Sequence, residues 1–205
     1  MEFAGTDCDC RPRFHAARRG RSFLMNSRAF ESARASIVAI GGADSAGKRG
    51  LIDDFLRRRR AEGLRVVGVV EARDPGAEAC ASRAVTDLAT GARIGISQNL
   101  GPGSTACALD PGGLALACAA VQRSLQQGAD LVVLSKFGKL EAGGGGLCDA
   151  FSAALEIGAP VVTTLHPVLR EDWARFAGDL AEEIAPEPQA LESWWRDVSR
   201  AARAA

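Results

Sequence analysis

The amino-acid sequence predicts an α/β fold, with a mostly parallel sheet, helices on both faces and a local β-hairpin. Two observations indicate this class. Short β-branched runs, such as residues 64–70, alternate with segments of helical spacing, such as residues 51–61. These runs are continuously apolar, which is typical of strands buried on both faces. With 205 residues and 47% hydrophobic content, the chain is long enough for one such domain.

The chain divides into three predicted parts. Residues 1–35 are expected to be a disordered basic arm, because residues 11–28 hold six arginines, no acidic residue and no apolar period. The α/β domain is expected over residues 36–185. A C-terminal amphipathic helix is expected over residues 186–205, packed on the domain or at a homodimer contact.

The first half of the domain is predicted to run from strand to helix to strand to hairpin. In chain order we expect a strand over residues 36–41, a helix over 51–61, a strand over 64–70, and hairpin arms over 85–88 and 92–97. Four arginines, residues 57–60, end the helix. We expect them to be solvated there, where cations complement the helix dipole. A nucleic-acid patch is the alternative interpretation of this run.

The second half alternates in the same way. In chain order we expect a helix over residues 110–127, a strand over 131–134, a helix over 147–157, a strand over 160–165 and a helix over 169–180. The glycine run at residues 141–146 is expected to be flexible, either as a lid or as a surface loop. Trp194 and Trp195 are expected to pack against the sheet, with a dimer contact as the alternative.

Composition narrows the classes of partner. The net charge is zero, so a broad attraction to nucleic acid or to a membrane has no support. No apolar run approaches the ~20 residues of a membrane-spanning helix. The six cysteines and the lack of a secretory signal predict a cytoplasmic protein with reduced thiols. Cys8 and Cys10 lack the C-x2-C spacing of a zinc site, so no metal centre is expected.

Lysine is rare in this chain, and its positions point to a site. Only Lys48, Lys136 and Lys139 are lysines among 25 lysine and arginine residues. Lys48 closes a G-x4-G-K pattern, typical of a loop that holds phosphate between a strand and a helix. Its glycines let backbone N–H groups turn toward an anion, and the helix N-terminus and the lysine add positive charge. The predicted anion-binding residues of this loop are Gly42, Ala43, Asp44, Ser45, Ala46, Gly47, Lys48 and Arg49.

Arg49 departs from the usual pattern of such a loop. A site for Mg²⁺ and a nucleotide places Ser or Thr at this position, because the hydroxyl is a metal ligand. An arginine side chain cannot ligate a metal ion. We therefore expect that Arg49 either supplies cationic charge to the ligand or points into solvent.

The second lysine segment, residues 131–141, resembles a motif of the small P-loop nucleoside-triphosphatase family. That motif is an apolar strand ending in Asp-Glu, followed by Ile-Gly-Lys-Met-Glu and a downstream Phe, here Phe151. The chain is more similar still to a bacterial family of P-loop-like proteins of uncharacterised function. That family carries "LGPGS-x2-C-x-LDP", here residues 100–111, and "KFGK-x-EA", here residues 136–142. Its members often sit near genes for molybdenum uptake.

The resemblance implies a P-loop NTPase-like three-layer fold, and it implies which residues have been replaced. The triphosphatases keep an acid that supports Mg²⁺ and an acid that activates water where this chain has Ser135 and Lys136. Residues 42–49 and 135–141 each carry a net charge of +1. If the two segments converge, the site suits an anion without a divalent metal. Ser135, Lys136 and Lys139 therefore join the predicted anion-binding set.

Three hypotheses for the function follow. The first is a nucleotide- or phosphate-binding protein, with ATP or GTP as possible ligands and with weak or absent Mg-dependent hydrolysis. The second is a non-enzymatic accessory protein that binds an oxyanion or cofactor and is linked to molybdenum metabolism. The third is an active triphosphatase in which Glu141 activates water, although a salt bridge to Lys139 or a solvated position is the alternative role for Glu141. Gly103, Ser104 and Cys107 are expected to line the same pocket.

Overall fold

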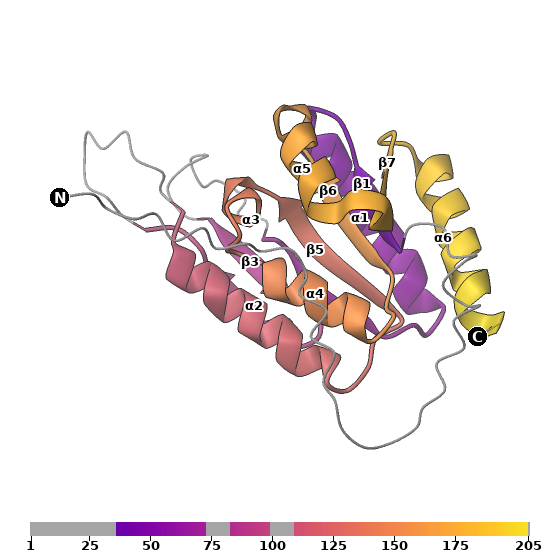
Figure 1. Ribbon diagram of the computed structural model, residues 1–205. Helices are drawn as coiled ribbons and strands as arrows, with labels where there is room; N and C mark the ends of the chain where they lie inside the picture. Colours follow the sequence, from indigo (N-terminus) through magenta and orange to yellow (C-terminus); the bar gives the residue numbers. More distant parts are fainter. Residues whose placement is uncertain (1–35, 73–82, 99–108, 205) are drawn as a thin grey trace, which may run out of the picture.

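The computed structural model describes residues 36–72, 83–98 and 109–204. Seven strands form one sheet in the order β4-β3-β2-β5-β6-β1-β7, with helices on both faces (Figure 1). The strands are β1 (Ile37–Ile40), β2 (Val66–Glu71), β3 (Ala84–Asp87), β4 (Arg93–Gly95), β5 (Leu131–Phe137), β6 (Val161–Leu165) and β7 (Ala181–Ile184). The helices are α1 (Ser45–Ala61), α2 (Pro111–Leu125), α3 (Lys139–Ala142), α4 (Cys148–Glu156), α5 (Arg170–Ala177) and α6 (Pro188–Ala204), with short 3-10 turns at Pro167–Leu169 and Gly178–Leu180.

The sheet pairing confirms the predicted fold class. β2, β5, β6, β1 and β7 are parallel neighbours, whereas β3 and β4 form an antiparallel hairpin on the edge of β2. Because parallel strands point the same way, the carboxyl ends of β1, β2, β5 and β6 lie along one edge of the sheet. In open α/β sheets this is the edge where ligands bind.

One face of the sheet is covered by α1 and α6, which lie side by side in Figure 1. Phe55 of α1 is fully buried, and Trp194 and Trp195 of α6 are 2% and 8% exposed in the same apolar cluster. The rings of Phe55 and Trp195 meet edge to face, 6.0 Å between centroids. Trp194 and Trp195 of α6 therefore pack into the same core as the strands, and the contact of Trp195 with Phe55 holds α6 against α1.

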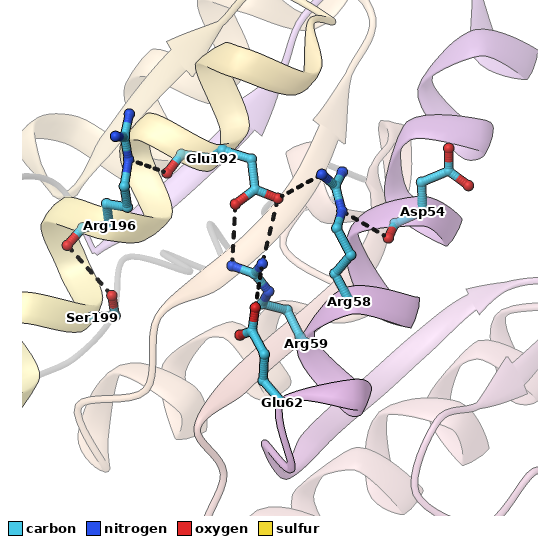
Figure 2. Close-up of polar contacts among 7 residues, drawn as sticks. All are labelled: Asp54, Arg58, Arg59, Glu62, Glu192, Arg196 and Ser199. Atoms are coloured by element: carbon cyan, nitrogen blue, oxygen red, sulfur yellow. Dashed lines mark hydrogen bonds and ion pairs between the residues drawn. The ribbon is translucent and has the colours of Figure 1, made fainter.

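A charged cluster joins α1 to α6 and corrects the prediction that Arg57–Arg60 are all solvated. Arg59 is buried and stacks on Phe55 and Trp195. Figure 2 shows its ion pairs with Glu62 and Glu192. The amphipathic side chain explains the difference, because its stem covers apolar surface while the guanidinium reaches two carboxylates. Arg59, together with Arg58, which also pairs with Glu192, therefore links α1 to α6.

The opposite face of the sheet is covered by α2, α4 and α5 (Figure 1). Four rings form a cluster there: the centroids of Phe137 and Phe151 each lie within 6.3 Å of those of both Trp173 and Phe176. Phe151 thus lies in the core, which accounts for the downstream Phe of the second motif. Phe151 therefore has a packing role. Phe137, the last residue of β5, lies in the same cluster and holds the carboxyl end of that strand in place.

Several elements differ from the sequence predictions, among them β5, which runs to Phe137, and the helix expected over residues 169–180, which is α5 between two 3-10 turns. α1 begins at Ser45 rather than residue 51, because Asp44 caps it and draws the end of the glycine loop into the first helical turn. β7 was not predicted, since its sequence, AEEI, lacks an apolar pattern, and its pairing with β1 decides its conformation. The short helix α3 was not predicted, and backbone hydrogen bonds such as Gly145 N–H to Leu140 O at 2.8 Å join the run at residues 141–146 to it.

Candidate functional site

The candidate site lies at the carboxyl edge of the sheet, where a small open pocket adjoins the start of α1. Its lining residues come from α1, β2, β5 and β6: Ser45, Arg49, Ile52, Asp53, Val70, Glu71, Ser135, Lys136 and Thr164. Arg49 and Lys136 therefore share one pocket, as does Ser135. The space inside is about 40 Å³. That is room for a few water molecules, well below the ~300 Å³ or more of a typical ligand pocket.

The glycine loop links β1 to α1 and is exposed along residues 43–47. Gly42 has φ of +108°, a backbone conformation that side chains disfavour, so glycine is required at this turn. The Asp44 carboxylate accepts hydrogen bonds from Ala46 N–H at 3.0 Å and Gly47 N–H at 3.1 Å. Two of the N–H donors that such a loop offers to a phosphate are thus bound to the chain's own carboxylate.

Lys48 lies beneath the loop, and it is not among the pocket-lining residues. It is 4% exposed, and its ammonium donates to the carbonyl oxygens of Gly42 and Leu165, the latter at 2.8 Å. Burial lowers the pKa of Lys48 below its ordinary value of 10.5, and the charge of Lys136 adds to this, while Asp44 and Glu183 oppose it. A ligand phosphate would have to compete with two carbonyls for this ammonium.

Glu183, on the edge strand β7, packs against Gly41 at the start of the glycine loop. Its carboxylate takes two hydrogen bonds from Arg170, at 2.6 and 2.7 Å. A side chain on Gly41 would meet its Oε1 atom at 2.3 Å, so the carboxylate packs directly on the glycine. The Arg170 hydrogen bonds lower the pKa of Glu183, partial burial opposes this, and the charges of Arg170 and Lys48 lower it further.

Lys136 is positioned by an irregularity in β5. The pairing of β5 with β6 shifts register between Leu134 and Phe137, so Ser135 and Lys136 stand where regular pairing is broken. Ser135 O accepts a hydrogen bond from the Thr164 hydroxyl at 3.0 Å. Lys136 projects to the surface and forms an ion pair with Glu71, 2.9 Å between Nζ and Oε1.

The predicted excess of positive charge is not found in this pocket. Arg49 and Lys136 line it, but so do Asp53 and Glu71, which gives two cations and two carboxylates. Sequence reasoning missed Asp53, Glu71 and Thr164. Glu71 could have been predicted as a site residue, because it directly follows the apolar run 64–70 and the carboxyl ends of parallel strands lie along one edge of the sheet.

Glu141 lies away from the pocket lining and is 5% exposed. Its carboxylate accepts hydrogen bonds from Gly138 N–H and Leu147 N–H, both at 2.9 Å, and caps the short helix α3. Gly146 has φ of +62°, and a side chain there would meet Glu141 Oε1 at 2.1 Å. Neither predicted alternative, a salt bridge to Lys139 or a solvated position, describes this buried cap.

The remaining predicted residues fall in three places. Lys139 is exposed at the start of α3 and does not line the pocket. Ala43 and Ala46 are exposed on the glycine loop. Gly103, Ser104 and Cys107 lie outside the described residues. Within the described ranges, no three His, Cys, Asp or Glu side chains gather into a group that suits a metal ion.

The sheet order and the loop between β1 and α1 define an α/β protein with a P-loop NTPase-like fold. The chain belongs to the family described as "Protein of unknown function (DUF2478)", whose family model matches residues 37–194. It is also similar to "Molybdenum import ATP-binding protein ModC 2" of Bradyrhizobium diazoefficiens, with 39% identity over 150 residues. The match covers 73% of this chain and 17% of that protein, so the chain spans about a sixth of its relative.

No solved structure matches the chain. Among the helices described here, none combines the length and the apolar character that crossing a membrane requires.

Proposed function

We propose that this chain binds a nucleotide, or a similar phosphate ligand, at the loop 42–48 and the pocket beside it, with little or no Mg-dependent hydrolysis. One observation carries the proposal. Arg49 and Lys136 line a single pocket next to the glycine loop, although they lie far apart in the sequence. They occupy the two positions where the triphosphatases that the chain resembles keep a metal-binding hydroxyl and an acid.

The chemistry of these two residues favours an anion without a divalent cation. An ammonium and a guanidinium supply the positive charge that Mg²⁺ would otherwise bring to phosphate oxygens. Neither an ammonium nor a guanidinium group can coordinate a metal ion. Ser45 and Ser135 line the same pocket, and their hydroxyls can donate to further oxygens, whereas the Thr164 hydroxyl already donates to Ser135 O.

The relative's name supports the nucleotide part of the proposal, since the segment shared with it belongs to a protein named for ATP binding. Because that segment is 17% of the relative, its nucleotide-binding activity is carried to this chain only as a proposal.

Calorimetric titration tests the proposal directly. ATP, GTP and inorganic phosphate are each titrated with and without Mg²⁺ into the wild type, Lys48→Ala and the surface variant Arg57→Ala. We expect binding that Mg²⁺ does not improve, a loss of at least tenfold in Lys48→Ala, and no change in Arg57→Ala, whose partner Asp54 is also exposed. Rapid Mg-dependent turnover, or a silent Lys48→Ala variant, would refute it.

A second candidate is an accessory protein that binds a small oxyanion. Two observations favour it: the pocket is small and rich in hydroxyls, and the relative is named for molybdenum import. A tetrahedral oxyanion needs far less room than a nucleotide. Molybdate and sulfate, titrated alongside ATP, distinguish the two, because this candidate requires molybdate to bind more tightly than ATP.

A further inference from the structure

Glu71 and Lys136 form an ion pair inside the candidate pocket. Glu71 is the last residue of β2, and Lys136 lies within the register shift of the neighbouring parallel strand β5. The Lys136 Nζ and Glu71 Oε1 atoms are 2.9 Å apart, and both residues line the pocket with Arg49. The pairing of β2 with β5 therefore places the Glu71 carboxylate next to Lys136, the residue at the position where the triphosphatases keep an acid.

The Glu71 carboxylate is surrounded by positive charge. Partial burial opposes its ionisation, yet the charge and hydrogen bond of Lys136, with the charges of Arg49 and Arg83, lower the pKa of Glu71 overall. Glu71 is therefore an anion at neutral pH. It occupies the position, beside Lys136 and near Arg49, that an anionic ligand would need.

We propose that Glu71 is a specificity-determining residue that acts as an exchangeable internal anion. Lys136 is paired with Glu71 when the pocket is empty, and it transfers its hydrogen bonds to a tetrahedral oxyanion when the ligand enters. This inference rests on the proposed function, since it concerns the same pocket. The ion pair therefore limits ligand affinity. A ligand binds well only if its contacts with the loop, the hydroxyls and Arg49 offset the free energy lost when the Lys136–Glu71 pair is broken.

A merely structural role for the ion pair predicts a different pattern. The side chains of Lys136 and Glu71 are 49% and 35% exposed, and ion pairs of this exposure contribute little to stability. Glu71→Gln, which keeps the shape of the side chain, is therefore expected to fold. Its effect should appear in anion affinity rather than in the unfolding midpoint.

A double-mutant cycle tests the exchange. The affinity for inorganic phosphate, molybdate and ATP is measured in the wild type and in Glu71→Gln, each with Lys136 present and in the Lys136→Met background. We expect Glu71→Gln to tighten binding about tenfold with Lys136 present and less than threefold in the Lys136→Met background. An equal gain in both backgrounds, or no gain at all, overturns the exchange. The three ligands distinguish a nucleotide phosphate from a free oxyanion.

Lysine spectroscopy supplies a second readout, because the chain has only three lysines. In protein labelled with ¹³C-lysine, three side-chain signals are expected, each assigned by its own variant. Saturation with phosphate should shift the Lys136 signal, and Glu71→Gln alone should shift it as well. Phosphate binding that depends on Lys48 but leaves the Lys136 signal unmoved refutes the exchange and leaves the proposed function standing. Absence of phosphate, molybdate and ATP binding in both the wild type and Glu71→Gln refutes both.

Discussion

The Nζ atom of Lys48 donates a hydrogen bond to the carbonyl oxygen of Leu165, 2.8 Å away, and so ties the start of α1 to the end of β6. The same ammonium bonds the carbonyl of Gly42. A lysine expected to face a ligand is thus also a structural link between the glycine loop and the sheet.

Lys48→Met should therefore lower stability as well as anion affinity. The methionine keeps the apolar stem, but two carbonyls lose their donor, and we expect the free energy of unfolding at pH 7 to fall by about 1–2 kcal/mol. Urea denaturation measures this change, with Lys139→Met as the control for an exposed lysine. An unchanged midpoint in Lys48→Met would show that the two bonds contribute nothing.

The difference between wild type and Lys48→Met should also grow as the pH rises toward 10.5. The pKa of Lys48 is lowered in the folded chain, so between that value and 10.5 the unfolded chain binds more protons at this residue. Wild-type stability therefore rises with pH relative to the variant. Urea titrations at pH 7 and pH 10 measure it, and a difference that shrinks would contradict the assigned direction.

Asp44→Ala should weaken α1 and free the loop donors. The carboxylate caps the N–H groups of Ala46 and Gly47, and loss of such a cap costs about 1 kcal/mol. Phosphate should bind more tightly, because the same N–H groups become available to it. Asp54→Ala, an exposed position on the same helix, is the matched control and should change stability by less than about 0.5 kcal/mol. Weaker phosphate binding in Asp44→Ala would show that the carboxylate does not compete with the ligand.

Glu141→Gln should destabilise the chain. Both oxygens of this buried carboxylate accept backbone N–H groups, and an amide can accept only one of them, so we expect a loss of about 1–3 kcal/mol. Urea denaturation measures the loss, and phosphate release from ATP with Mg²⁺ is followed in parallel. A variant with wild-type stability that has lost turnover would instead support the water-activating role predicted for Glu141.

Arg59→Lys should loosen α6 from α1. A lysine ammonium cannot bridge Glu62 and Glu192 while stacking on Phe55, so we expect a loss of about 2 kcal/mol. Urea denaturation followed by tryptophan fluorescence reports the change near Trp195. Arg57→Lys, at an exposed ion pair on the same helix, should be nearly silent. Equal effects of the two substitutions would contradict the buried role of Arg59.

Glu183→Gln should make the fold less sensitive to acid. The pKa of Glu183 lies below its ordinary value of 4.5 because Arg170 donates hydrogen bonds to the carboxylate, with burial opposing. Its contribution to stability is therefore present above pH 4.5 and is lost as the pH falls through the lowered value. The gap between wild type and variant in urea midpoint should be open at pH 7 and should close below pH 4.5. A constant gap would contradict this account.

Much of the fold could be predicted from local pattern. The apolar runs of β1, β2, β5 and β6 and the turn of the hairpin are visible in the sequence, because burial on both faces leaves little choice of residue. β7 could not be predicted, since AEEI becomes a strand only through pairing with β1. Arg59 was misjudged for a similar reason: its partners, Glu192 and Trp195, come from a helix more than 130 residues later in the chain.

The candidate site, too, has features that the sequence predicts and features that only tertiary contacts decide. The sequence by itself determined that a glycine loop with Lys48 precedes a helix. Its resemblance to the triphosphatases further predicts that Arg49 and Lys136 stand where those proteins keep a metal-binding hydroxyl and a water-activating acid. Only the tertiary structure decided which carboxylates contact the glycine loop and which one pairs with Lys136. Asp44 turns back onto its own loop, Glu183 approaches Gly41 from β7, and Glu71 reaches Lys136 from the neighbouring strand. Charge balance in a pocket is a property of side chains brought together by strand order, and strand order is fixed by long-range pairing rather than by any local run of residues.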